Sequence, residues 1–262
     1  CGALGTGIVR EGRIQASLGT SGTVVAHTDS VKVEPEMKLH TFCHTVPGAW
    51  YLMGVVLQAG GSFKWFRDTL AIEEIEAAKK ENTDPYNILF NKAVNVPIGS
   101  EGLLFLPYLS GERTPHQDGK ARGAWVGLTL THSKEHLVRA VIEGITFAMR
   151  DSVELMRTLG IEVSQVRIIG GGAKNPLWRQ MQADVYNAEV VTVSSEEGPA
   201  FGAAILAGTG AGIYSDVRDA ADEVIKPVDS YIPNPENVKI YEEYYQIFRE
   251  LYPSLKDGFA KL

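Results

Sequence analysis

Three apolar, strand-like segments of this chain each end in a turn rich in glycine, and this pattern limits the fold more than any other feature. The turns are residues 17–22, 59–62 and 170–175. Glycine lets the backbone adopt a positive φ and approach a ligand or another segment closely. Such turns are typical of tight hairpins and also of sites where the main chain holds a phosphate group.

The first 27 residues predict a meander of three antiparallel strands. Apolar runs at 5–10, 14–18 and 23–27 are separated by short turns that contain glycine, as in consecutive hairpins. This opening differs from the strand–helix–strand start of a dinucleotide-binding fold.

Predicted helices and strands alternate in the rest of the chain. A long helix is expected after Thr131, because apolar residues recur there at helical spacing. The other predicted strands are 50–57, 103–106, 124–130, 166–169 and 190–193, and the other predicted helices are 63–70, 72–81, 85–93, 176–186, 199–211 and 235–251. Alternation favours parallel strands that are covered by helices. We therefore predict an α/β domain with a mixed sheet, helices on both faces and an insertion of surface helices at about residues 72–95.

Composition and charge restrict the partners of the chain. The net charge is −7, so we expect no broad basic surface for a nucleic acid. No apolar run reaches the roughly 20 residues that cross a bilayer, so no membrane partner is expected. Cys1 and Cys43 show no metal-type spacing, which favours a reduced, cytoplasmic protein, with a Cys1–Cys43 bridge as the alternative. The chain begins at Cys1 inside an apolar segment, and we expect it to be a piece of a longer protein.

The first turn contains Gly19, Thr20 and Ser21, which are candidates for binding a phosphate group. The glycine allows close approach of the main chain, and the two hydroxyl groups can donate hydrogen bonds to phosphate oxygens. A plain glycine-rich hairpin turn is the alternative interpretation.

The other two turns precede predicted helices. Gly60 and Gly61 begin one helix, and Lys64 lies one turn inside it; Gly171, Gly172 and Asn175 lead into another. Because a helix amino terminus favours an anion, both turns are candidates for contact with a nucleotide.

The third turn matches a known nucleotide fingerprint only in part. Gly170 and Gly172 fit the first two glycines of the dinucleotide motif, but Asn175 occupies the place of the third. Glycines needed only for close packing are the alternative. Since the chain has no G-x-x-x-x-G-K-[ST] loop, we hypothesise that backbone amides at the three turns converge on one nucleoside triphosphate.

The segment His132-x-x-Glu135-His136 superficially matches an inverted zinc-peptidase motif. These residues lie at the start of the long predicted helix beside Ser133. Helix capping therefore explains them better than a metal, and we predict no metal ligands in this chain.

At several segments the sequence resembles the FGGY carbohydrate kinases. The carboxyl-terminal signature of that family is matched by Gly123-Ala124-Trp125-Val126-Gly127-Leu128, followed by His136-Leu137 and Ala140-Val141-Ile142-Glu143. The segment Phe105–Pro115 and the ending Leu251-Tyr252-Pro253 are most similar to the bacterial members that act on D-xylulose.

The resemblance implies an actin-like ATPase domain of the ribonuclease H type, one of two domains that close over ATP and a sugar. It assigns the three turns named above to the nucleotide, and it puts the catalytic aspartate upstream of Cys1. Most sugar contacts and most carboxylates that organise Mg²⁺ are expected in an amino-terminal domain, so this chain alone is expected to be inactive. The face left exposed between the domains is a candidate for homodimer formation.

The expected reaction of the intact parent is transfer of the γ-phosphoryl group from MgATP to the ketopentose D-xylulose. Ribulose, gluconate or glycerol are alternative acceptors, because most specificity is expected in the other domain. A non-enzymatic ATP-binding module and a dehydrogenase-like protein, the latter based on Gly170–Gly172, are alternatives of other classes.

Overall fold

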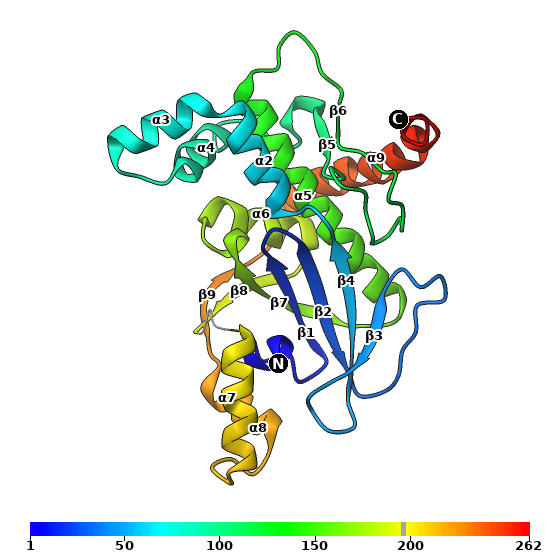
Figure 1. The fold of residues 1–262 in the computed structure, drawn as a ribbon, viewed down its shortest axis with the longest axis vertical. Helices are drawn as coiled ribbons and strands as arrows, with labels where there is room; N and C mark the ends of the chain where they lie inside the picture. Colours follow the sequence, from blue (N-terminus) through cyan, green and yellow to red (C-terminus); the bar gives the residue numbers. More distant parts are fainter. Residues whose placement is uncertain (195–197) are drawn as a thin grey trace.

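The computed structural model describes residues 1–194 and 198–262. The described residues form a seven-stranded mixed sheet in the order β3-β4-β2-β1-β7-β8-β9 (Figure 1). Its strands are β1 (Gly12–Leu18), β2 (Gly22–Thr28), β3 (His40–Cys43), β4 (Trp50–Val56), β7 (Val163–Gly170), β8 (Glu189–Val193) and β9 (Pro227–Tyr231), while β5 (Leu104–Leu106) and β6 (Ala124–Val126) pair separately. The pairs β1–β7 and β7–β8 are parallel, and the other neighbours are antiparallel.

Helices cover both faces of the sheet, as predicted. They are α1 (Gly2–Gly5), α2 (Gly60–Leu70), α3 (Ile72–Glu81), α4 (Pro85–Ala93), α5 (Lys134–Thr158), α6 (Pro176–Tyr186), α7 (Gly198–Gly210), α8 (Val217–Val224) and α9 (Pro235–Phe259). Ile14, Ala16 and Leu18 of β1 join a large core with α5, α6 and α9, whereas a smaller core contains residues of α1, α7 and α8. Gln15 of β1 faces the second group of helices, since it accepts a hydrogen bond from Thr6 just after α1. The period-2 alternation of β1 thus directs its side chains to two cores.

Residues 5–10 do not form a strand, contrary to the prediction. Residues Gly2–Gly5 form α1, and the Thr6 hydroxyl donates to carbonyl oxygens of that helix. Gly7 has a φ of +73°, which turns the chain away from an extended path. Ile8 is fully buried, so the apolar character of this segment reflects a buried connection rather than a strand. The three antiparallel strands are instead β1, β2 and β4.

Helices with strong capping signals begin where the sequence predicts. The Asp84 carboxylate accepts a hydrogen bond of 2.9 Å from the Tyr86 amide, and Pro85 is the first residue of α4. The Asn175 side chain caps α6 in the same way, through the amide of Leu177. These local signals confirm the predicted helices 85–93 and 176–186.

Other boundaries differ from the prediction. Strand β6 ends at Val126, because Gly127 has a φ of +98° and the chain leaves the sheet. Helix α9 continues past the predicted end at Leu251 to Phe259. The prediction also missed β3, β9 and α8. In the case of β9, the strand is largely exposed and lacks an apolar alternation.

The capping interpretation of the His132–His136 segment is confirmed. Ser133 and His136 form a reciprocal capping box at the start of α5, and the His132 ring accepts a hydrogen bond from the Thr129 amide. Among the described residues no group of three or more His, Cys, Asp or Glu side chains is placed to hold a metal ion. In the same part of the chain, no helix is both long and apolar enough to cross a membrane.

Candidate functional site

The three glycine-rich turns line one cavity of about 500 Å³. The turn between β1 and β2 lies at the amino terminus of α2, and the turn after β7 leads into α6 beside it (Figure 1). The predicted site residues that line the cavity are Gly19, Thr20, Gly60, Lys64, Gly171, Gly172 and Asn175. Ser21 and Gly61, which were also predicted, are not among its lining residues.

Main-chain hydrogen bonds join the first two turns. The Gly60 amide donates to the Gly19 carbonyl oxygen over 2.9 Å, and the Gly61 amide donates to the Thr20 carbonyl oxygen over 2.9 Å. The Gly19 amide donates to the carbonyl oxygen of Ser21 over 3.0 Å. These three amides are therefore occupied within the protein, and the expectation that they point at a triphosphate is wrong. The hydroxyl groups of Thr20 and Ser21 are exposed and have no hydrogen-bond partner among the described residues, and of the two residues Thr20 lines the cavity. The Thr20 hydroxyl is therefore available to a ligand in the cavity.

The glycines of the third turn have different roles. A Cβ atom on Gly172 would lie 2.5 Å from Cδ1 of Leu18, so this buried glycine is required for packing of the turn against β1. Gly170 has a φ of +81°, which favours glycine on conformational grounds. Gly171 is exposed, and a Cβ atom there would have only the Leu18 carbonyl oxygen nearby, at 3.5 Å. Gly171 is therefore the residue of this turn with open space in front of it.

Two lysines give the cavity a positive charge. Lys64 of α2 and Lys174 of the third turn are exposed and line the cavity, and no ion pair among the described residues includes either of them. Asp84 is the one carboxylate among the described lining residues, and it caps α4. The cavity therefore has an excess of cationic groups with no partner, which suits an anionic ligand.

Aromatic side chains form another wall of the cavity, and the sequence analysis did not identify them as site residues. Phe63 of α2 packs on Tyr86 of α4 with ring centroids 5.0 Å apart, and on Trp178 of α6 at 6.0 Å. Phe90 of α4 completes the group, 5.8 Å from Trp178. Burial raises the pKa of Tyr86 above its ordinary value. Flat apolar rings of this kind match the faces of a nucleobase.

Helix α4 therefore contributes to the site, although the sequence indicates only a surface insertion. Helices α3 and α4 extend from the body of the domain, and α4 turns one side toward α2 and α6 (Figure 1). A sequence signal was present, since Tyr86 and Phe90 are four residues apart and share one side of the predicted helix. The side that they face depends on tertiary packing.

Comparisons with known proteins identify the family of the chain. Residues 14–211 match the model of the FGGY family of carbohydrate kinases, C-terminal domain. The chain is 39% identical over 257 residues to a xylulose kinase of Bacillus subtilis, an alignment that covers 98% of this chain and 50% of that protein. It is 33% identical over 265 residues to a gluconokinase of Bacillus licheniformis, with 99% of this chain and 50% of that protein covered.

Solved structures give the same result. The crystal structure of ligand-bound xylulose kinase from Lactobacillus acidophilus matches with a TM-score of 0.89 and 28% identity, over 99% of this chain and 51% of that one. The chain thus spans about half the length of the relatives that it matches. The likeness confirms the predicted actin-like ATPase fold and the resemblance of the signature segments. The chain belongs to the FGGY family of carbohydrate kinases and corresponds to the carboxyl-terminal domain of that family.

Proposed function

We propose that this chain is the nucleotide-binding domain of an ATP-dependent kinase that phosphorylates D-xylulose to D-xylulose 5-phosphate. The observation that carries the proposal is one cavity with an aromatic wall on one side and, on the other, lysines and a hydroxyl group that have no partner among the described residues. The 39% identity to a xylulose kinase supports the choice of sugar.

In this proposal the aromatic wall holds the adenine base, and Thr20, Lys64 and Lys174 contact the phosphate chain. Phosphoryl transfer depends largely on positioning and on stabilisation of negative charge, which these groups supply. The glycine turns contribute indirectly, because their mutual hydrogen bonds hold Thr20 in place.

The described residues do not form a Mg²⁺ site. The cavity has one carboxylate among its described lining residues, Asp84, and that group accepts a hydrogen bond from the Tyr86 amide. We infer that Mg²⁺ arrives with ATP, that most of its protein ligands and most sugar contacts belong to an amino-terminal domain, and that the proton acceptor lies a few residues upstream of Cys1. The chain by itself is then expected to be inactive, and a cytoplasmic location follows from its use of ATP and a sugar.

Gluconate is the alternative acceptor favoured by a specific observation, the 33% identity to a gluconokinase. A panel of xylulose, ribulose, gluconate and glycerol, assayed with the full-length parent, distinguishes these substrates. If the parent phosphorylates another sugar of the panel in preference to xylulose, the proposed substrate is wrong, but the assignment as a kinase still holds. Formation of a homodimer stays a prediction, which sedimentation of the parent can test.

Substitution of Thr20 tests the role of the cavity. In the full-length parent, Thr20→Ala should raise the KM for ATP about tenfold, the loss typical of one hydrogen bond to a charged group, while the KM for sugar changes little. Ser21→Ala is the matched control, because Ser21 belongs to the same turn and does not line the cavity. Equal KM values for ATP in both variants and the parent contradict the assignment. Robust turnover of xylulose and ATP by this chain alone contradicts the placement of the proton acceptor outside it.

A further inference from the structure

A second cavity, of about 510 Å³, lies between the carboxyl-terminal half of α5 and helix α9. It shares no lining residue with the cavity at the glycine-rich turns. Asp151 of α5 lines it and is only 6% exposed. The rings of His116 and Tyr252 stack beside it with centroids 3.8 Å apart. The cavity therefore combines a buried carboxyl group with an aromatic pair.

The Asp151 carboxyl group has unused hydrogen-bonding capacity. One oxygen accepts a hydrogen bond of 2.7 Å from the Tyr245 hydroxyl, and the other has no partner in the described part of the chain. Burial raises the pKa of Asp151 to about 7. Such a group suits a ligand hydroxyl, which can both donate and accept a hydrogen bond.

Two cations at the same cavity lie outside any ion pair of the described residues. Arg249 and Lys256 of α9 line the cavity and are exposed, and no ion pair among the described residues includes them. Arg150 differs, since it is paired with Glu154 of its own helix and with Glu242 of α9. Arg249 and Lys256 are therefore cations of the rim that lie outside ion pairs, although the charges of Asp151 and Glu242 act on Arg249 and that of Asp118 acts on Lys256. An anionic group of a ligand can reach both side chains.

We propose that this cavity binds a small phosphorylated sugar, with the phosphate at Arg249 and Lys256 and a sugar hydroxyl at Asp151. The basic rim matches a phosphate monoester, and the buried carboxyl group matches the polyol part of the same molecule. The two requirements are met within one enclosure of a size suited to a small ligand.

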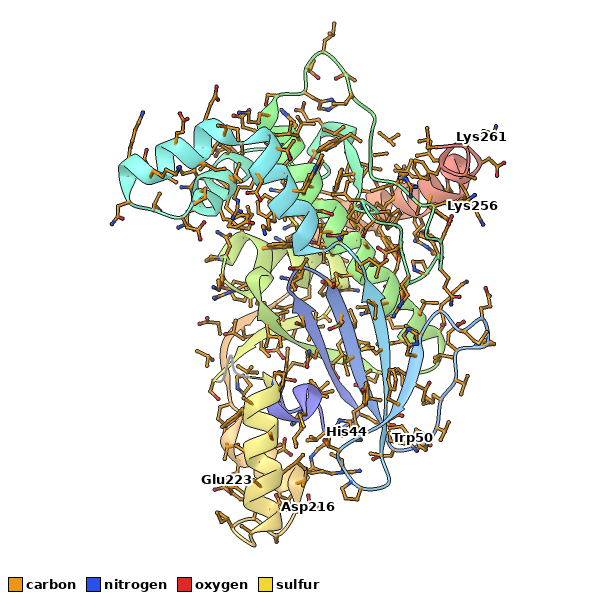
Figure 2. The ribbon with its side chains drawn as sticks, in the orientation of Figure 1. His44, Trp50, Asp216, Glu223, Lys256 and Lys261 are labelled. Carbon is orange, nitrogen blue, oxygen red and sulfur yellow. The ribbon has the colours of Figure 1, made fainter. Side chains whose placement is uncertain are left out.

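Titration calorimetry of the chain with D-ribose 5-phosphate as the probe tests the proposal. Arg249→Ala combined with Lys256→Ala should weaken binding at least about tenfold, because two charge-assisted contacts are lost. The control is Lys239→Ala combined with Lys261→Ala, which changes the net charge equally at residues that do not line the cavity. Figure 2 shows Lys256 and Lys261 near the same end of the molecule, so these two members of the paired variants have similar surroundings.

Two further measurements separate this site from the nucleotide cavity. The Asp151→Asn variant retains a hydrogen-bond acceptor for Tyr245. It should weaken the binding of D-ribose 5-phosphate several-fold, while the binding of inorganic phosphate stays unchanged. Thr20→Ala and an excess of ATP analogue should leave probe binding unchanged, whether or not the kinase proposal holds. The inference is overturned if the chain does not bind the probe at millimolar concentration, if both double variants bind it equally, or if the nucleotide displaces it.

Discussion

The Gly60 amide donates a hydrogen bond to the Gly19 carbonyl oxygen over 2.9 Å, and a Cβ atom on Gly60 would lie 2.4 Å from that oxygen. Two turns that are about 40 residues apart in sequence thus meet through their main chains alone. The contact sets the position of Thr20, which lines the cavity and whose hydroxyl group has no hydrogen-bond partner among the described residues.

Gly60→Ala should therefore disrupt the contact between the turns. The added methyl group must displace a carbonyl oxygen, so we expect a loss of about 1–3 kcal/mol in the free energy of unfolding and a higher KM for ATP in the parent. Urea unfolding and steady-state kinetics measure the two effects. Gly258→Ala in α9 is the control, because nothing lies within 4 Å of its Cβ position, and it should be neutral or stabilise the helix by up to about 1 kcal/mol. A Gly60→Ala variant as stable and active as this control would show that the close contact is unimportant.

Substitution by valine should have different consequences at Gly171 and at Gly172. At Gly172 the side chain collides with Leu18, so the melting temperature should fall by several degrees. At Gly171 the side chain extends into open space, so the fold should remain stable while the KM for ATP rises. Thermal unfolding together with ATP kinetics of the parent distinguishes the two. Loss of stability in both variants, with no selective effect on ATP, contradicts the assignment of Gly171 to the cavity.

Glu74 should anchor the helices that carry part of the aromatic wall. This carboxylate of α3 is 2% exposed and lies 2.8 Å from Nζ of Lys92 in α4 and 3.3 Å from Nζ of Lys134 in α5. Glu74→Gln should cost about 1–2 kcal/mol in the free energy of unfolding, since both lysines retain partial access to water. Glu73→Gln, at a side chain that is 87% exposed, should cost less than about 0.5 kcal/mol. Urea unfolding followed by tryptophan fluorescence measures both variants, and equal costs would exclude a special role for the buried pair.

Glu112 should make the fold less stable as the pH rises. Burial raises the pKa of Glu112 to about 8. One of its oxygens accepts hydrogen bonds from the amides of Leu57 and Arg113, and the other is buried with no partner in the described part of the chain. A carboxyl group with a raised pKa stabilises the fold while protonated, and this contribution is lost as the pH rises through the pKa of the folded state. With about 1.4 kcal/mol for each pKa unit, we expect a loss of about 1 kcal/mol between about pH 7 and pH 8.5.

Glu112→Gln should remove that loss of stability, because an amide does not ionise. Urea unfolding at several pH values measures the difference between the variant and the unchanged chain. Burial lowers the pKa of His44 and His116 to about 4, so these two residues make the fold more stable as the pH rises toward the ordinary histidine pKa of about 6.5. That increase is complete above this value, and the measurements therefore begin near pH 7. Parallel stability curves for the two proteins would show that Glu112 ionises normally.

Local sequence signals were sufficient for many helices and for the family assignment. Asp84 with Pro85, and Asn175 with Pro176, mark the starts of α4 and α6, because a cap and a proline act within a few residues. The same signals were insufficient at residues 5–10, where an apolar run lies in a buried connection.

The sequence by itself determined the alternation of strands and helices, the three glycine-rich turns and the membership in the kinase family. Only the tertiary structure decided which groups of those turns remain free, since the amides of Gly19, Gly60 and Gly61 bond within the protein. It also decided that Tyr86 and Phe90 join Phe63 and Trp178 in one aromatic wall of the cavity. The physical reason is range: capping and periodicity act between near neighbours in the chain, whereas these contacts join segments that are close only after the sheet and its helices have packed together.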